Sequence, residues 1–138
     1  MNKIKWCAKQ KNGIKFVKYD EDTFSGFIEQ AQDAILARRE LTSNKWKLVT
    51  AYYACYNYLC AILQKLEIKS AIHECTIAIS EYIGFSIPEI KFISNLKEKR
   101  INAQYNENRC SESISDLKDG VLRLSRLDAI FRLRVITT

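Results

Sequence analysis

The chain has 138 residues, of which 47% are hydrophobic and 28% charged, with only four glycines and one proline. This composition excludes general disorder and argues against a many-stranded sandwich or barrel, in which turn residues recur every few positions. We therefore expect an all-α fold of a size that can bury a core without a metal ion or a disulfide.

The net charge of +6 originates in the first 18 residues, which hold six lysines and no acid. Because the whole chain has 22 basic and 16 acidic residues, the remainder carries 16 of each and is formally neutral. A basic segment can attract phosphate at long range, although lysine runs more often only solvate an arm. Both interpretations stay open for residues 1–19, which we separate from a helical domain at residues 20–138.

Residues 3–19 contain a turn signal. Asn12-Gly13 is typical of a two-residue β-turn, and Ile14 and Phe16 alternate with lysines. The pattern predicts a short β-hairpin, with an arm that is ordered only on binding as the alternative. Because an isolated hairpin is marginal in water, we expect it to pack on the domain or on a partner, with Trp6 as its anchor.

The rest of the chain is helical by its periodicity. Apolar residues three and four positions apart predict five helices, at about residues 24–41, 45–66, 72–83, 87–105 and 114–131. With short connections, these form a five-helix antiparallel up-and-down bundle.

Several helix ends also carry sequence signals. Asp22 or Thr23 can cap the first helix, and Gly84 is suited to end the third. Ser86 and Glu89 have the spacing of a capping box at the start of the fourth helix.

The second helix has apolar residues on two faces, so we expect it to be central or to form an oligomer interface. One stripe includes Val49, Tyr53 and Tyr56, and the other includes Tyr52 and Leu59. Its most apolar stretch, residues 49–63, is shorter than the roughly 20 residues of a membrane span, so we expect no membrane association.

The five cysteines are odd in number and form no C-x-x-C pair. Cys55, Cys60 and Cys75 lie in apolar helical patterns and are interpreted as small core residues. Lysines stand where a signal peptide would have an apolar run. We therefore expect a reducing, cytoplasmic location.

Common enzyme signatures are missing: there is no phosphate-binding loop, dinucleotide fingerprint, hydrolase nucleophile motif or zinc-protease motif. His73 is the single histidine, so no second one completes a zinc set, and we expect no metal and no cofactor. A lone histidine is more often a helix-end or packing residue than a catalyst.

Residues 97–105 are the most suggestive segment. Arg100 ends an apolar ladder on the fourth helix, so we expect it on a buried or interfacial face, where it needs a carboxylate, a phosphate or carbonyl groups. The candidate nucleotide- or RNA-binding residues are Lys97, Arg100, Asn102, Gln104 and Tyr105. The simpler interpretation is that Arg100 forms an ion pair with a neighbouring helix.

Short motifs follow one another in an order that resembles the HEPN domain family over roughly residues 20–134. They are Ala51-Tyr52-Tyr53-Ala54 with an apolar run to Leu63, then His73, then Arg100, Ala103 and Tyr105 in the form R-x-x-A-x-Y. Trp6-Cys7 and Gly13-Ile14 are similar to small archaeal-type members.

The resemblance implies a homodimeric helical bundle with paired fourth-helix motifs facing across a cleft. It also implies a minimal nucleotidyltransferase as partner, in a toxin–antitoxin or defence module. Active HEPN members are metal-independent ribonucleases with an R-x4–6-H motif and a polar residue after the arginine. Here Ile101 follows Arg100, and Tyr105 stands where the histidine would be.

Metal-independent RNA cleavage needs a group that accepts a proton and a group that donates one, and tyrosine with a pKa near 10 is a poor base. The sequence therefore favours binding of nucleotide or RNA phosphate over catalysis. Two alternatives remain: a non-catalytic protein-interaction module, and a weak ribonuclease that uses Arg100, Tyr105 and His73.

Overall fold

The computed structural model describes residues 2–105 of the backbone and residues 2–102 of the side chains. Within this part the chain forms five helices and two short strands. In chain order they are α1 (Lys3–Lys9), β1 (Lys15–Phe16), α2 (Glu21–Glu40), α3 (Asn44–Lys65), β2 (Ile68–Lys69), α4 (His73–Tyr82) and α5 (Ile87–Tyr105). The expected all-α fold is confirmed, with α2 to α5 close to their predicted bounds. The helix predicted at 114–131 lies outside the described residues.

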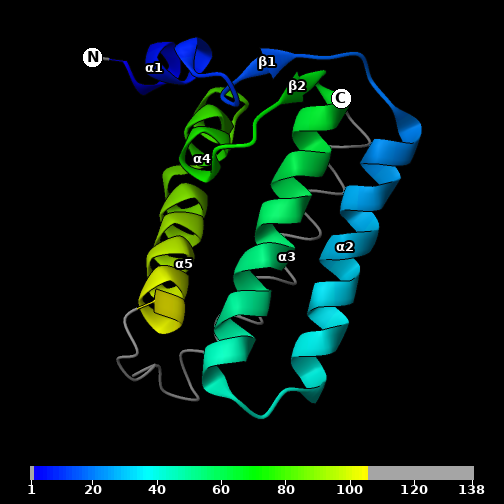
Figure 1. Ribbon diagram of the computed structural model, residues 1–138, viewed down its shortest axis with the longest axis vertical. Helices are drawn as coiled ribbons and strands as arrows, with labels where there is room; N and C mark the ends of the chain where they lie inside the picture. Colours follow the sequence, from blue (N-terminus) through cyan, green and yellow to red (C-terminus); the bar gives the residue numbers. More distant parts are fainter. Residues whose placement is uncertain (1, 106–138) are drawn as a thin grey trace.

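The long helices α2, α3 and α5 lie side by side and alternate in direction, with α3 between the other two (Figure 1). Thirteen of the 22 residues of α3 are buried, and they include Tyr52, Leu59 and Ile62. α2 covers one side of this helix, while Ile93 and Leu96 of α5 pack on another. The two apolar stripes of α3 therefore fit its central position in the bundle.

The helix ends show why the elements begin where they do. Asp20 accepts a hydrogen bond from the Thr23 amide at 3.0 Å, so it caps α2 in place of the predicted Asp22 or Thr23. The capping box of α5 is confirmed, because the Ser86 amide donates to Glu89 and the Glu89 amide donates to Ser86 Oγ. Gly84 has a φ of 99°, which is the left-handed backbone expected after α4.

In the N-terminal layer, which α1, β1 and β2 form, the strand pairing differs from the predicted one. Residues 3–9 form α1, which Asn2 caps by accepting from the Ile4 amide at 2.9 Å. The two-stranded antiparallel sheet pairs β1 with β2, with Lys15 opposite Lys69, so Asn12-Gly13 does not join two strands. Instead, Gly13 lies so close to the end of α1 that an added Cβ would stand 1.8 Å from the Cys7 carbonyl oxygen.

The cysteines also differ from expectation. Cys7 of α1 and Cys75 of α4 form a disulfide across a sequence separation of 68 residues, so Cys75 is buried but not a free thiol. Cys55 and Cys60 are free and buried, as predicted. Burial raises the pKa of the Cys60 thiol to about 12, which keeps it protonated. The described part of the chain contains no helix with the length and apolarity needed to cross a bilayer.

Candidate phosphate-binding site

Five side chains from three helices meet on one side of α3. Tyr52, Tyr53 and Tyr56 come from the middle of α3, His73 from the first position of α4, and Arg100 from the last turns of α5. We call these five residues the tyrosine–arginine cluster. Because positions 52 and 56 are one helical turn apart, their rings project from the same side of α3 toward α4.

Arg100 lies against two of the tyrosines. Its Cζ is 5.0 Å from the ring centroid of Tyr52 and 5.5 Å from that of Tyr53, and its Nη1 donates to Tyr53 Oη at 3.4 Å. Only 8% of Arg100 is exposed, so the prediction that it faces a buried or interfacial side is confirmed. The two aromatic faces stabilise the guanidinium by cation–π attraction.

His73 is held by Tyr52 and Tyr56. Its Nδ1 lies 2.7 Å from Tyr52 Oη, and its ring stacks on Tyr56 at 3.9 Å between centroids and 9° between planes. Tyr56 is fixed in turn by a 3.2 Å hydrogen bond to Thr76, on the same first turn of α4 as His73. The imidazole is therefore fixed by a hydrogen bond on one nitrogen and by a stacked ring on one face.

The protonation of this pair follows from burial and charge. Burial chiefly raises the pKa of Tyr52, so its hydroxyl keeps its proton near neutral pH. Burial, and then the charges of Arg100 and Lys97, lower the pKa of His73 from its ordinary value of 6.5. A neutral imidazole therefore faces a protonated phenol. Within the described residues Tyr52 Oη bonds only to His73, so we assign the Tyr52 hydroxyl as donor and place the imidazole proton on Nε2.

The other predicted binding residues fall into two groups. Lys97 is half-buried one turn before Arg100, and its charge acts on His73, so it belongs beside the cluster. Asn102 is exposed on α5. Gln104 and Tyr105 belong to the backbone of α5, but their side chains lie outside the described part, so their roles stay predictions.

Two of the tyrosines of α3 lie in the core. Tyr52 is 0% and Tyr58 is 1% exposed, so both are core residues and neither offers a ring face to a base. Tyr53 and Tyr56 are partly exposed. Sequence reasoning named Arg100 and His73 separately but did not foresee that Tyr52 contacts both. The Ala51-Tyr52-Tyr53-Ala54 motif was the available signal.

The described residues contain no group of three or more His, Cys, Asp or Glu side chains suited to a metal ion. Comparisons of the chain with protein-family models, with curated proteins and with solved structures find no match. The HEPN resemblance therefore rests on the motifs alone.

Proposed function

We propose that this domain binds a phosphate group of a nucleotide or an RNA at Arg100, His73 and Lys97. The observation that carries the proposal is that Arg100 and His73, 27 positions apart in the sequence, both contact the ring of Tyr52, with Lys97 close enough to affect His73. Two cations that lower the pKa of a neighbouring imidazole create a positive potential, and such a potential attracts an anion.

The donors at this place suit phosphate. A guanidinium presents a planar set of N–H groups that matches two phosphate oxygens, and the assigned His73 tautomer leaves Nε2–H as a further donor. The Nε2 atom has no hydrogen-bond partner among the described residues. Tyr53 and Tyr56 keep the two donor groups rigid, which lowers the entropy lost when a ligand is bound.

The same tautomer favours binding over cleavage. A general base must offer an unprotonated nitrogen, and the nitrogen free of the protein carries the proton here. A metal-independent ribonuclease remains the second candidate, because the structure brings the single histidine to the same tyrosine as Arg100. That activity would require Tyr52 to release His73 Nδ1, so that the two imidazole nitrogens exchange roles.

We extend the proposal to the biological setting through the sequence resemblance. The motif residues Tyr52, Tyr53 and Arg100, which carry the likeness to HEPN domains, contact one another, and this supports a shared role. On this basis we propose a cytoplasmic homodimer that works with a minimal nucleotidyltransferase in a toxin–antitoxin or defence module. Light scattering that finds a monomer at micromolar concentration would contradict the dimer.

Titration of the Arg100 variants with a nucleotide and a single-stranded oligoribonucleotide tests the site. Arg100→Lys keeps the charge but loses the planar fork, and we expect binding weaker by roughly 1–3 kcal/mol. Arg100→Ala should weaken it further. Lys91→Ala removes one exposed charge from the same helix and should leave affinity nearly unchanged.

A melting curve of each variant separates the alternatives. If Arg100→Ala unfolds the protein and Arg100→Lys binds as the wild type does, Arg100 is a structural residue and the interaction-module hypothesis gains. Cleavage of the RNA in EDTA that depends on Arg100 and His73 would instead establish the ribonuclease.

A further inference from the structure

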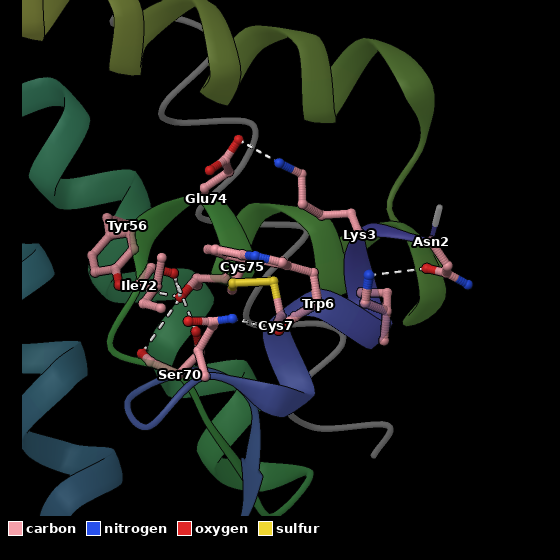
Figure 2. The surroundings of a disulfide bond; sticks show 12 residues. Asn2, Lys3, Trp6, Cys7, Tyr56, Ser70, Ile72, Glu74 and Cys75 are labelled. Atoms are coloured by element: carbon pink, nitrogen blue, oxygen red, sulfur yellow. Dashed lines mark hydrogen bonds and ion pairs between the residues drawn. A yellow bond between two sulfur atoms is a disulfide. The ribbon is translucent and has the colours of Figure 1, made fainter.

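Within residues 2–105 the helix α1 makes few contacts with the other elements. Of its seven residues only Cys7 is buried, and Cys7 is the residue bonded to Cys75 (Figure 2). The one ion pair that α1 forms with another described residue joins Lys3 Nζ to Glu74 Oε1 at 2.6 Å, with both side chains about half exposed, at 49% and 51%. Exposed ion pairs contribute little to stability, and a helix this short is marginal by itself in water. The disulfide is therefore the principal attachment of α1.

The space beneath α1 supports this conclusion. A pocket of about 370 Å³ lies between Asn2, Lys3 and Ile4 on the α1 side and Ile77 and Ile90 on α4 and α5. Because this space is not filled by side chains of α1, moving the helix away removes little apolar contact. Little burial therefore opposes its release.

The segment that follows α1 is held more firmly than α1 itself. Asn12 accepts a backbone hydrogen bond from Ala71 at 2.9 Å, and the Val17 amide donates to Glu67 at 3.0 Å. Together with the pairing of β1 and β2, these bonds hold the chain from about residue 12 onward. Loss of the disulfide would thus leave β1 in place and leave α1 with one backbone bond to this segment, from the Ile14 amide to the Cys7 carbonyl at 3.1 Å, which is too little to hold a short helix.

We propose that the Cys7–Cys75 disulfide is a site of thiol–disulfide exchange with a dithiol reductant, and that its reduction releases α1 and its lysines from α4. Because Cys7 and Cys75 are both 0% exposed, the attack follows a local opening of the short helix α1. A thiolate of the dithiol then attacks one sulfur of the bond, forming a mixed disulfide and freeing one cysteine. The second thiol of the reductant then displaces the other cysteine. Two electrons pass to the protein, two protons end on Cys7 and Cys75, and the dithiol leaves as its disulfide.

The release changes the charge available to a polyanion. Lys3, Lys5 and Lys9 are fixed on α1 in the oxidised protein and become part of a mobile segment in the reduced one. After reduction the chain stays attached at Asn12, which bonds to Ala71 two positions before His73, so the released segment is tethered close to the tyrosine–arginine cluster. This consequence, unlike the release, rests on the proposed phosphate site: the reduced protein should bind RNA more tightly.

Hydrogen exchange of the whole chain tests the release directly. In the oxidised wild type the α1 amides should be protected. After treatment with a dithiol, confirmed by a mass increase of two hydrogen atoms, they should exchange like an unstructured peptide while α2 to α5 stay protected.

Cys7→Ser should behave as the reduced protein without any reductant. Ala8→Ser, which introduces serine at an exposed position of the same helix, should behave as the oxidised wild type. Continued protection of α1 after reduction, or peptide mapping that finds no Cys7–Cys75 link, overturns the proposal.

Binding of a single-stranded oligoribonucleotide at several salt concentrations tests the consequence. Engaging three more lysines should steepen the slope of log K against log salt by up to about 2, at roughly 0.7 per phosphate contact. Equal slopes in the two redox states would overturn the role of the lysines in binding. If neither state binds RNA, the phosphate site fails, while the exchange data still decide whether α1 is released.

Discussion

The bundle around α3 and the N-terminal layer formed by α1, β1 and β2 are held in different ways. Thirteen of 22 residues are buried in α3, but only one of seven in α1. The bundle is stabilised by many buried side-chain contacts, each of which contributes a part of the stability. The N-terminal layer depends instead on a disulfide and a few backbone hydrogen bonds. A disturbance in the bundle should therefore affect the whole molecule, and one in the N-terminal layer should stay local.

The largest expected effect comes from a cavity in the bundle. Leu59 on α3 is 0% exposed, so Leu59→Ala should lower the free energy of unfolding by about 2–5 kcal/mol in urea denaturation followed by circular dichroism. Leu36→Ala is the control, because Leu36 on α2 is 57% exposed and its truncation should cost less than about 0.5 kcal/mol. Similar losses in both variants would contradict the packing described for α3.

Removal of the disulfide should have a smaller global effect. A cross-link that closes a loop of 68 residues contributes about 4 kcal/mol in the chain-entropy model, if both ends stay in place after reduction. Because α1 can detach and regain conformational freedom, we expect Cys7→Ser to lower the free energy of unfolding by only about 2 kcal/mol, the low end of the usual range. A loss of the full amount, with α1 still protected from exchange, would mean that α1 is held by contacts other than the bond.

The same contrast explains what the sequence could predict. The bundle helices α2 to α5 show themselves through repeated apolar positions and through caps such as Ser86 with Glu89, because local periodicity and long-range burial agree there. In α1 the local pattern and the observed structure disagree, because the alternation around the Asn12-Gly13 turn signal favoured a pair of strands. The two residues of β1 pair with residues 54 and 52 positions away, and Cys7 pairs with a residue 68 positions away. Neither pairing leaves a local pattern.

The candidate site was likewise predictable only in part. The position of Arg100 at the end of an apolar ladder was sufficient to predict its burial. The hydrogen bond between Tyr52 and His73 depends on how α4 packs on α3, and one sequence contains no periodic signal for a polar contact between two helices. Burial could be predicted for single residues, whereas their meeting in one cluster could not.

Tyr52→Phe tests that polar contact within the bundle. The change removes the hydroxyl bonded to His73 Nδ1 while keeping the ring, and we expect a loss of about 1 kcal/mol in stability. Tyr82→Phe, at a tyrosine that is 65% exposed, should stay within about 0.5 kcal/mol of the wild type. Nitrogen-15 NMR of the imidazole should show the proton on Nε2 in the wild type and a mixture of tautomers in Tyr52→Phe. A wild-type proton on Nδ1 would contradict the assignment.

The smallest effect concerns the titration of His73, the single histidine of the chain. Its pKa is lowered in the folded protein by burial, by Arg100 and by Lys97, from 6.5 in the unfolded chain. Between the folded value and 6.5 the unfolded state therefore binds more protons, so the free energy of unfolding decreases as the pH falls through this window. Above pH 6.5 the protein has the full stability that a neutral His73 allows, and below the folded pKa this part of the free energy of unfolding is completely lost. His73→Gln cannot be protonated, so its stability should depend less on pH over the same range.

NMR titration of the imidazole links this effect to the proposed site. Lys97→Gln removes one of the two charges and should move the pKa of His73 back toward 6.5, whereas Lys91→Gln, on an exposed part of α5, should leave it nearly unchanged. An inorganic phosphate bound beside Arg100 should also raise the pKa of His73, because a nearby anion stabilises the imidazolium. If saturating phosphate leaves the titration curve of the wild type in place, the anion does not bind at the tyrosine–arginine cluster. A rise in the wild type that disappears in Arg100→Lys would locate the phosphate beside Arg100 and His73.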